Sequence, residues 1–91
     1  MYFRITNYRA EPANHDALMA RIEQMRDQIS AIPGLHGVRS ADLGGGRYIT
    51  IAMYGSKEEA DAAADSAKAV WGGLADLLDM DSLSIDQGER E

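Results

Sequence analysis

Two residues of this chain could take part in chemistry because each is expected at a buried position. Asn7 continues the alternation of Phe3 and Ile5, so its amide is expected on the apolar face of a strand, where it needs a hydrogen-bonding partner. A ligand or oxyanion could be that partner, and so could local backbone or water at the strand end. Trp71 falls on the apolar stripe of a helix. We interpret it either as core or as the wall of a pocket that stacks on an aromatic substrate.

The two histidines, His15 and His36, are the other candidates for acid–base or metal chemistry. His36 could act as a general base, and the alternative is an exposed histidine at a strand end without an orienting partner. Neither histidine has a second ligand at metal spacing, and the chain has no cysteine. The sequence therefore predicts no metal site.

Four strands must position these residues. Alternating side chains predict strands over 2–9, 35–43, 47–54 and 82–87. The glycines 44–46 predict a hairpin turn between the second and third strands, because a strand rather than a helix follows them. Residues 88–91 are expected to fray.

Two helices complete the chain. Asn14 is the expected N-cap of the first helix, and Pro33 ends it. Its apolar stripe consists of Leu18, Ile22, Met25, Ile29 and Ile32. Ser56 to Glu59 form a capping box that opens the second helix, which the glycine pair 72–73 is expected to kink or split. Small residues on its buried face, Ala67 among them, either let it approach the sheet closely or leave a cavity.

The order β-α-β-β-α-β predicts one domain over 1–91 with an α+β ferredoxin-like fold. This fold is a four-stranded antiparallel sheet with both helices on one face. The side chains expected to face the helices are Phe3, Ile5, Asn7, Ile49, Ile51 and Met53. The other face would then carry Tyr2, Thr6, Tyr8, Tyr48, Thr50, Ala52 and Tyr54. That face is too apolar to leave in water, so we expect a second copy to cover it in a homodimer.

Composition excludes several classes of partner. The 91 residues carry a net charge of −6, which disfavours nucleic acid and anionic membranes. No apolar run approaches the length of a membrane span. The chain enters its first strand at Tyr2 without a recognisable targeting segment. A cytoplasmic protein is the expectation.

Three stretches resemble the dimeric α/β-barrel superfamily, in particular the antibiotic-biosynthesis-monooxygenase-like domains. They are the immediate first strand with Asn7, the Ile-Pro-Gly-Leu sequence at 32–35, and the Met-Tyr-Gly-Ser-Lys-Glu-Glu-Ala sequence at 53–60. The resemblance implies two sheets packed into a barrel, with a pocket between the sheet and helices of each subunit. It also implies a cofactor-independent monooxygenase acting on a small aromatic, phenolic or quinol-type molecule.

The candidate site residues follow from this resemblance and from the expected faces. Asn7 and His36 are the candidate catalytic residues. The candidate substrate-binding residues are Asn7, Met53, Ala63, Ala67 and Trp71, and no cofactor is expected. One alternative is a non-catalytic small-molecule-binding or structural homodimer. A further alternative is a haem-binding or haem-degrading protein, although Ala63 and Gly73 stand where the haem-degrading members carry tryptophan and histidine.

Overall fold

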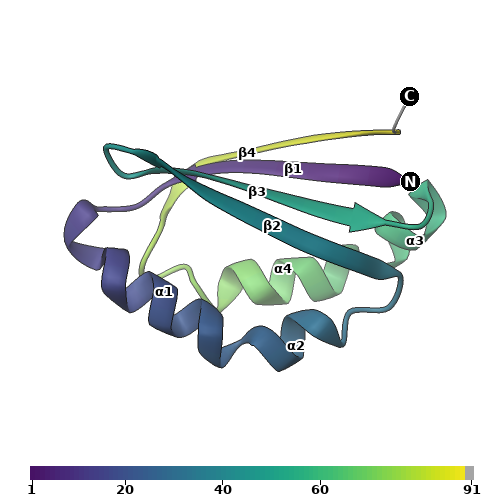
Figure 1. Ribbon diagram of the computed structural model, residues 1–91, viewed down its shortest axis with the longest axis horizontal. Helices are drawn as coiled ribbons and strands as arrows, with labels where there is room; N and C mark the ends of the chain where they lie inside the picture. The colour runs from purple at the N-terminus through teal and green to yellow at the C-terminus, as the bar shows by residue number, and fades with distance from the viewer. Residues whose placement is uncertain (90–91) are drawn as a thin grey trace.

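The chain folds into a four-stranded antiparallel sheet with its helices on one face, as a computed structural model of residues 1–89 shows (Figure 1). The strands are β1 (Tyr2–Arg9), β2 (Leu35–Gly44), β3 (Arg47–Tyr54) and β4 (Asp79–Glu89), in the spatial order β2-β3-β1-β4. The helices are η1 (Pro12–Asn14), α1 (His15–Gln24), α2 (Arg26–Ser30), α3 (Lys57–Ala62) and α4 (Ala64–Gly72). The predicted α+β ferredoxin-like fold is confirmed.

Strand boundaries follow the alternating pattern closely. β1 and β3 have the predicted bounds, and the glycines at 44–46 form the hairpin turn with φ values of 86°, 64° and 80°. Such positive φ values favour glycine. β4 begins three residues earlier than predicted, and Gly88 and Glu89 belong to it instead of a frayed end. The rest of that predicted end, 90–91, lies outside the described residues.

Both predicted helices are broken in the middle. The first divides at Met25 and the second at Ala63, whereas the glycines at 72–73 end α4 instead of kinking it. The predicted N-cap at Ser56 is confirmed, because the Glu59 N–H donates to its Oγ at 3.2 Å. Asn14 stands before α1 but makes no capping hydrogen bond with its side chain.

The face of the sheet that meets the helices is the opposite of the predicted one. Phe3, Ile5, Asn7, Ile49, Ile51 and Met53 lie half-buried on the open face. The helices instead cover Tyr2, Arg4, Thr6, Tyr8, Tyr48, Thr50, Ala52 and Tyr54. This set can be buried because its polar atoms are paired. No buried side-chain nitrogen or oxygen within residues 1–89 lacks a hydrogen-bond partner.

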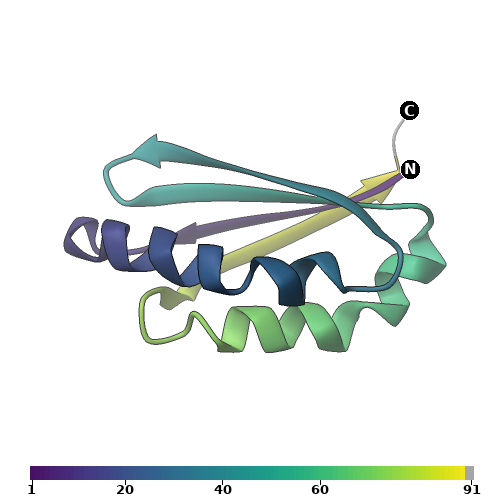
Figure 2. The ribbon, with the colours of Figure 1, turned by 60° about the horizontal axis from the view of Figure 1, so that its bottom comes forward.

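The layer between sheet and helices holds the core. Figure 2 shows α1–α2 and α3–α4 running side by side beneath the sheet. Leu18 and Ala60 are fully buried, and Tyr54 is 2% exposed. Ala60 is the one buried residue of α3, and its small side chain allows this helix to approach the sheet closely. The pocket described below lies along α4.

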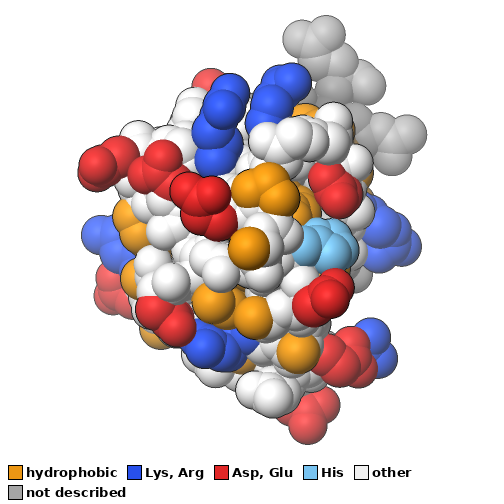
Figure 3. Space-filling model, turned by 90° about the vertical axis from the view of Figure 1, so that its left-hand side faces the viewer, with side chains coloured by type: hydrophobic (Ala, Val, Ile, Leu, Met, Phe, Trp, Pro, Cys, Tyr) orange, Lys and Arg blue, Asp and Glu red, His pale blue; other side chains and the backbone are white. Residues whose placement is uncertain are grey.

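Acidic side chains do not form a single dominant patch on the surface at the end of the molecule that carries the β2–β3 turn. Figure 3 shows acidic side chains there dispersed among basic and hydrophobic ones. None of the helices within residues 1–89 is both long enough and apolar enough to cross a membrane.

Candidate ligand pocket between sheet and helices

A pocket of about 90 Å³ lies between the sheet and the helical layer. Its sheet side is built by every second residue of β1 and β3, because side chains on one face of a strand recur with a period of two. β2 contributes three residues, with a register shift between Leu35 and Gly37. The sheet-side residues are Arg4, Thr6 and Tyr8 from β1, Thr50, Ala52 and Tyr54 from β3, and Leu35, Val38 and Ser40 from β2. The helical side is apolar and consists of Ile22, Ile29, Ile32, Ala67, Val70, Trp71 and Leu74.

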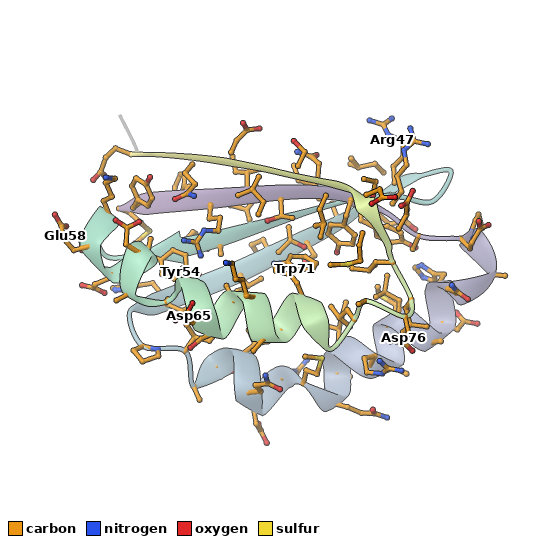
Figure 4. All side chains as sticks on the ribbon, turned by 180° about the vertical axis from the view of Figure 1, so that it is seen from behind. Arg47, Tyr54, Glu58, Asp65, Trp71 and Asp76 are labelled. Atoms are coloured by element: carbon orange, nitrogen blue, oxygen red, sulfur yellow. The ribbon has the colours of Figure 1, made fainter. Side chains whose placement is uncertain are left out.

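One end of the pocket is aromatic. The Trp71 indole meets the Tyr8 ring edge-on, with centroids 5.0 Å apart, and Tyr8 stacks on Tyr48 at 5.5 Å. Trp71 extends from α4 into the layer below the sheet (Figure 4). Since Trp71 is only partly buried, its ring offers free aromatic surface to a ligand.

A short chain of hydroxyl groups crosses the sheet side of the pocket. The Tyr8 hydroxyl lies 3.1 Å from Thr50 Oγ1, which lies 2.9 Å from Ser40 Oγ. Burial raises the pKa of Tyr8, and the hydrogen bond with Thr50 partly opposes this effect. Tyr8 therefore stays protonated at neutral pH, where it can hold a ligand oxygen but cannot remove a proton as a base.

The other end of the pocket carries a buried cation. Arg4 is 8% exposed, and its guanidinium carbon lies 5.2 Å from the centroid of the Tyr54 ring. Its Nη1 donates to the Tyr54 hydroxyl at 3.2 Å, and its Nη2 donates to the Ala60 carbonyl at 2.9 Å. Ala60 lies in the last turns of α3, where helical carbonyls lose their intrahelical partners. The arginine thus joins β1 to the break between α3 and α4.

A wider groove of about 550 Å³ adjoins the pocket between α1–α2 and the edge strand β2. Its rim carries His36, Glu23 and Arg26. The groove and the pocket share five lining residues, which are Ile22, Ile29, Leu35, Val38 and Ser40. The pocket and the groove therefore adjoin along this shared wall.

A histidine–tyrosine pair lies beyond the aromatic end. His15 Nδ1 and the Tyr48 hydroxyl are 2.7 Å apart, and Asp42 Oδ2 lies 3.8 Å from the same nitrogen. Burial raises the pKa of Tyr48, with smaller contributions from the negative charge of Asp42 and from Tyr8. Tyr48 is 4% exposed and does not line the pocket. The pair therefore fastens α1 to β3 and does not contact a pocket ligand.

The structure separates the residues that the sequence proposed for one site. Trp71 and Ala67 line the pocket, whereas Ala63 is 1% exposed and packs into the core beside it. His36 lies at the groove.

Asn7 and Met53 lie on the opposite face of the sheet, so the candidate substrate-binding residues do not line one space with Trp71. Asn7 instead borders a surface hollow of about 290 Å³ that Ser82, Ser84 and Arg47 also line. The error follows directly from the inverted face, because the strand period of two moves every side chain together.

Sequence reasoning missed Arg4 and Tyr8 as pocket residues. Tyr8 was assigned to the predicted subunit interface with Thr6, and Arg4, on the same side of β1, was assigned to no site. The available signal was Arg4 itself, since an arginine midway along a strand, flanked by tyrosines two and four residues away, is better suited to a polar pocket than to a flat apolar interface.

No group of three or more histidine, aspartate or glutamate residues within 1–89 could hold a metal ion.

Comparisons with known proteins agree with this architecture. Neither family models nor curated proteins give a match. Among solved structures, NE2512 from Nitrosomonas europaea, a protein of unknown function, superposes with a TM-score of 0.78 at 16% identity, over 98% of this chain and 87% of that one. A structure named antibiotic biosynthesis monooxygenase gives 0.76 at 9% identity, over 100% and 99%. SnoaB from Streptomyces nogalater, a cofactor-independent oxygenase, gives 0.76 at 10% identity, over 99% and 92%.

The chain has the fold of the antibiotic biosynthesis monooxygenases. This agreement covers nearly the whole length of both partners, so it confirms the predicted resemblance at the level of fold. At these identities individual residues cannot be carried over, and the function must be argued from the pocket.

Proposed function

We propose that this protein binds a small aromatic, phenolic or quinol-type molecule in the pocket and oxidises it as a cofactor-independent monooxygenase. The observation that carries the proposal is the pocket itself, which combines the exposed ring surface of Trp71 with the hydroxyl groups of Tyr8 and Thr50. The pocket of about 90 Å³ is smaller than the ~150 Å³ cavity that holds benzene in another protein. A one-ring ligand therefore extends into the adjoining groove.

The proposed oxygenation requires few catalytic groups from the protein. In an oxygenation of this type the deprotonated substrate reduces oxygen directly. A CH₂ group becomes a carbonyl, one oxygen atom enters the product, and the other leaves as water with the two hydrogens. The protein has to orient the substrate, exclude bulk water and stabilise the anion. Trp71 and Tyr8 orient the ring, the apolar helical wall excludes water, and Arg4 is the one cation that residues 1–89 contribute to the lining.

His36 stays our candidate for the proton acceptor. It lies at the groove, outside the inner pocket. It would therefore accept the proton while the substrate is in the groove, before the substrate reaches the inner pocket. His36→Ala should then reduce turnover and leave binding almost unchanged.

Trp71 is the only tryptophan, so its fluorescence reports on the pocket without a label. Titration with a quinol or anthrone analogue should change this emission saturably, and an oxygen electrode should record uptake that depends on the protein and matches product formation one to one. Binding with no oxygen uptake for any such analogue would contradict the monooxygenase proposal. Free N-acetyltryptophanamide titrated with the same analogue serves as the control for direct quenching.

A second candidate is a binding protein without turnover. It is favoured by one observation, that within residues 1–89 no carboxylate or histidine lines the inner pocket. The same titration separates the two, because this candidate predicts saturable binding with no oxygen uptake.

Haem chemistry fits the pocket poorly. Residues 1–89 contribute no histidine to the lining of the inner pocket, and the volume of the pocket is far below that of a tetrapyrrole. Titration with haem should therefore leave the Soret band close to that of free haem, and a stoichiometric shift would contradict this expectation.

We also propose a homodimer formed through the open face of the sheet. Phe3, Ile5, Ile49, Ile51 and Met53 make this face apolar along its two central strands. An apolar patch of this kind is typical of an interface. The sequence also predicted a dimer through the face without helices, but it placed the tyrosines on that face instead of these five residues.

A cytoplasmic location is part of the same proposal, and cell fractionation would test it.

A further inference from the structure

The buried arginine in the pocket has no negative partner within the described part of the chain, residues 1–89. Arg4 is more than nine-tenths buried. Its two protein acceptors, the Tyr54 hydroxyl and the Ala60 carbonyl, are both neutral. Among residues 1–89 the ion pairs involve other groups, and no carboxylate pairs with Arg4. A charge removed from water is costly unless an opposite charge compensates it, so this site is electrostatically incomplete.

The guanidinium also has hydrogen-bonding capacity to spare. It carries five N–H donors, and the protein uses one on Nη1 and one on Nη2. The side chain lines the pocket, so the remaining donors are available to a molecule held there. Arginine suits this task because its planar fork pairs with oxyanions through two parallel hydrogen bonds.

We propose that the pocket selects an anionic ligand, namely an apolar one-ring molecule that carries a single carboxylate or phenolate oxygen group bound by Arg4. The inference deepens the proposed function and rests on it, since it concerns the same pocket. The anionic group lies at the Arg4 end, the ring lies against Ala67 and Trp71, and the part of the ring that the pocket of about 90 Å³ does not hold extends into the adjoining groove.

The length of the pocket favours an elongated ligand. Arg4 and Tyr8 are four residues apart on β1, which places their Cα atoms about 13 Å from one another. Both side chains line the same space. A ring near the aromatic end therefore needs a short linker to bring its anionic group to the arginine, as in an arylalkanoate.

The overall charge of the protein works against this selectivity. The chain carries a net charge of −6, which repels anions in general. A preference for the anion must therefore come from a local cation, and Arg4 is the only cationic side chain that lines the pocket in the described part of the chain.

The test compares two probes of nearly the same shape, 3-phenylpropanoate and the neutral 3-phenylpropanol, by Trp71 fluorescence and calorimetry. We expect the acid to bind the natural protein at least about tenfold more tightly, as a charge-assisted hydrogen bond would provide. Arg4→Met should remove this preference and leave the affinity for the alcohol within about twofold. The control Arg9→Met changes an exposed arginine on the same strand and should retain the preference.

4-Nitrophenol distinguishes the phenolate from the carboxylate, because its anion absorbs visible light. If Arg4 holds a phenolate, the bound phenol should ionise at lower pH than free phenol, and this shift should disappear in Arg4→Met. A preference for 3-phenylpropanoate without the shift would assign the site to carboxylates.

The outcomes that overturn the inference are distinct from those that overturn the function. Equal binding of acid and alcohol by the natural protein, or an acid preference that survives in Arg4→Met, would overturn the anion site and leave the pocket standing. Failure of both probes to bind would overturn the pocket and with it this inference. If Arg4→Met does not fold by circular dichroism, Arg4→Lys replaces it. That variant keeps the charge but not the fork, so it should favour the acid by less than the natural protein does, and an unchanged preference would overturn the bidentate site.

Discussion

The Trp71 indole meets the Tyr8 ring edge-on with 5.0 Å between their centroids, at the point where the pocket reaches the aromatic end of β1. This contact joins α4 to the central strand of the sheet while leaving part of the indole free. Edge-to-face pairs of this kind contribute about 0.5–1.5 kcal/mol beyond the area they bury.

Trp71→Ala should therefore lower the free energy of unfolding by about 2 kcal/mol, which is less than the ~3–5 kcal/mol expected for a fully buried tryptophan. Trp71→Phe should cost about 1 kcal/mol, because it keeps a ring against Tyr8. Urea unfolding followed by circular dichroism measures both. A loss of about 4 kcal/mol or more in Trp71→Ala would show that the residue is core and not a pocket wall.

Asn7→Leu should leave ligand binding in the pocket unchanged, because Asn7 lies on the opposite face of β1. Its effect on stability should stay within about 1 kcal/mol, as is usual for a partly exposed site. Calorimetry with 3-phenylpropanol tests this, with Ala67→Leu as the positive control that fills the pocket. A selective loss of binding in Asn7→Leu would mean that the amide reaches the pocket after all.

Ile51→Asp should dissociate the proposed homodimer. Ile51 lies on the open face of β3 between Ile5 of β1 and Arg39 of β2, so an aspartate there would place a charge in the apolar centre of the interface, at a desolvation cost that one neighbouring arginine does not offset. Light scattering at micromolar concentration should give twice the chain mass for the natural protein and a single chain for the variant. Ile85→Asp, at an edge-strand residue that is 52% exposed and pairs with Thr6, should remain dimeric. A monomeric natural protein would refute the interface.

The pKa of Tyr8 is raised in the folded state above its ordinary value of 10.0, mainly by burial. A raised pKa means that Tyr8 contributes stability below about pH 10 and loses that contribution as the pH rises through the folded-state value. Tyr8→Phe should therefore unfold at a temperature that falls less steeply above about pH 10 than that of the natural protein. Thermal melts followed by circular dichroism across this range test the expectation, and parallel curves would contradict it.

Most of the fold could be predicted because local signals agreed with the tertiary structure. The alternation of β1 and β3, the three glycines of the hairpin and the cap at Ser56 each depend on neighbouring residues alone. The hydrogen bond from Arg4 of β1 to the Ala60 carbonyl, next to the break at Ala63, joins residues that are 56 positions apart. No local pattern contains that information.

The covered face of the sheet could not be read from hydrophobicity. Both faces of β1 are partly apolar, and the more aliphatic one, with Phe3 and Ile5, is the obvious candidate for the core. The structure buries the tyrosine side instead, since the hydroxyl of Tyr54 accepts from Arg4 and that of Tyr48 lies beside His15. Burial of polar atoms depends on partners that are distant in sequence. The wrong face was therefore assigned to the helices, and the candidate site residues were chosen from that face.

The two faces of β1 are separated only by its backbone, and they contact different parts of the structure. Arg4 and Thr6 line the pocket, while their chain neighbours Phe3 and Ile5 face away from the helices. If a second copy covers that outer side, the ligand and the partner subunit contact the front and back of the same strand. Any free energy by which the ligand strengthens association must equal the free energy by which association strengthens ligand binding. Dilution of the protein, which dissociates the dimer, would then change the affinity for the ligand even though the two surfaces share no residue.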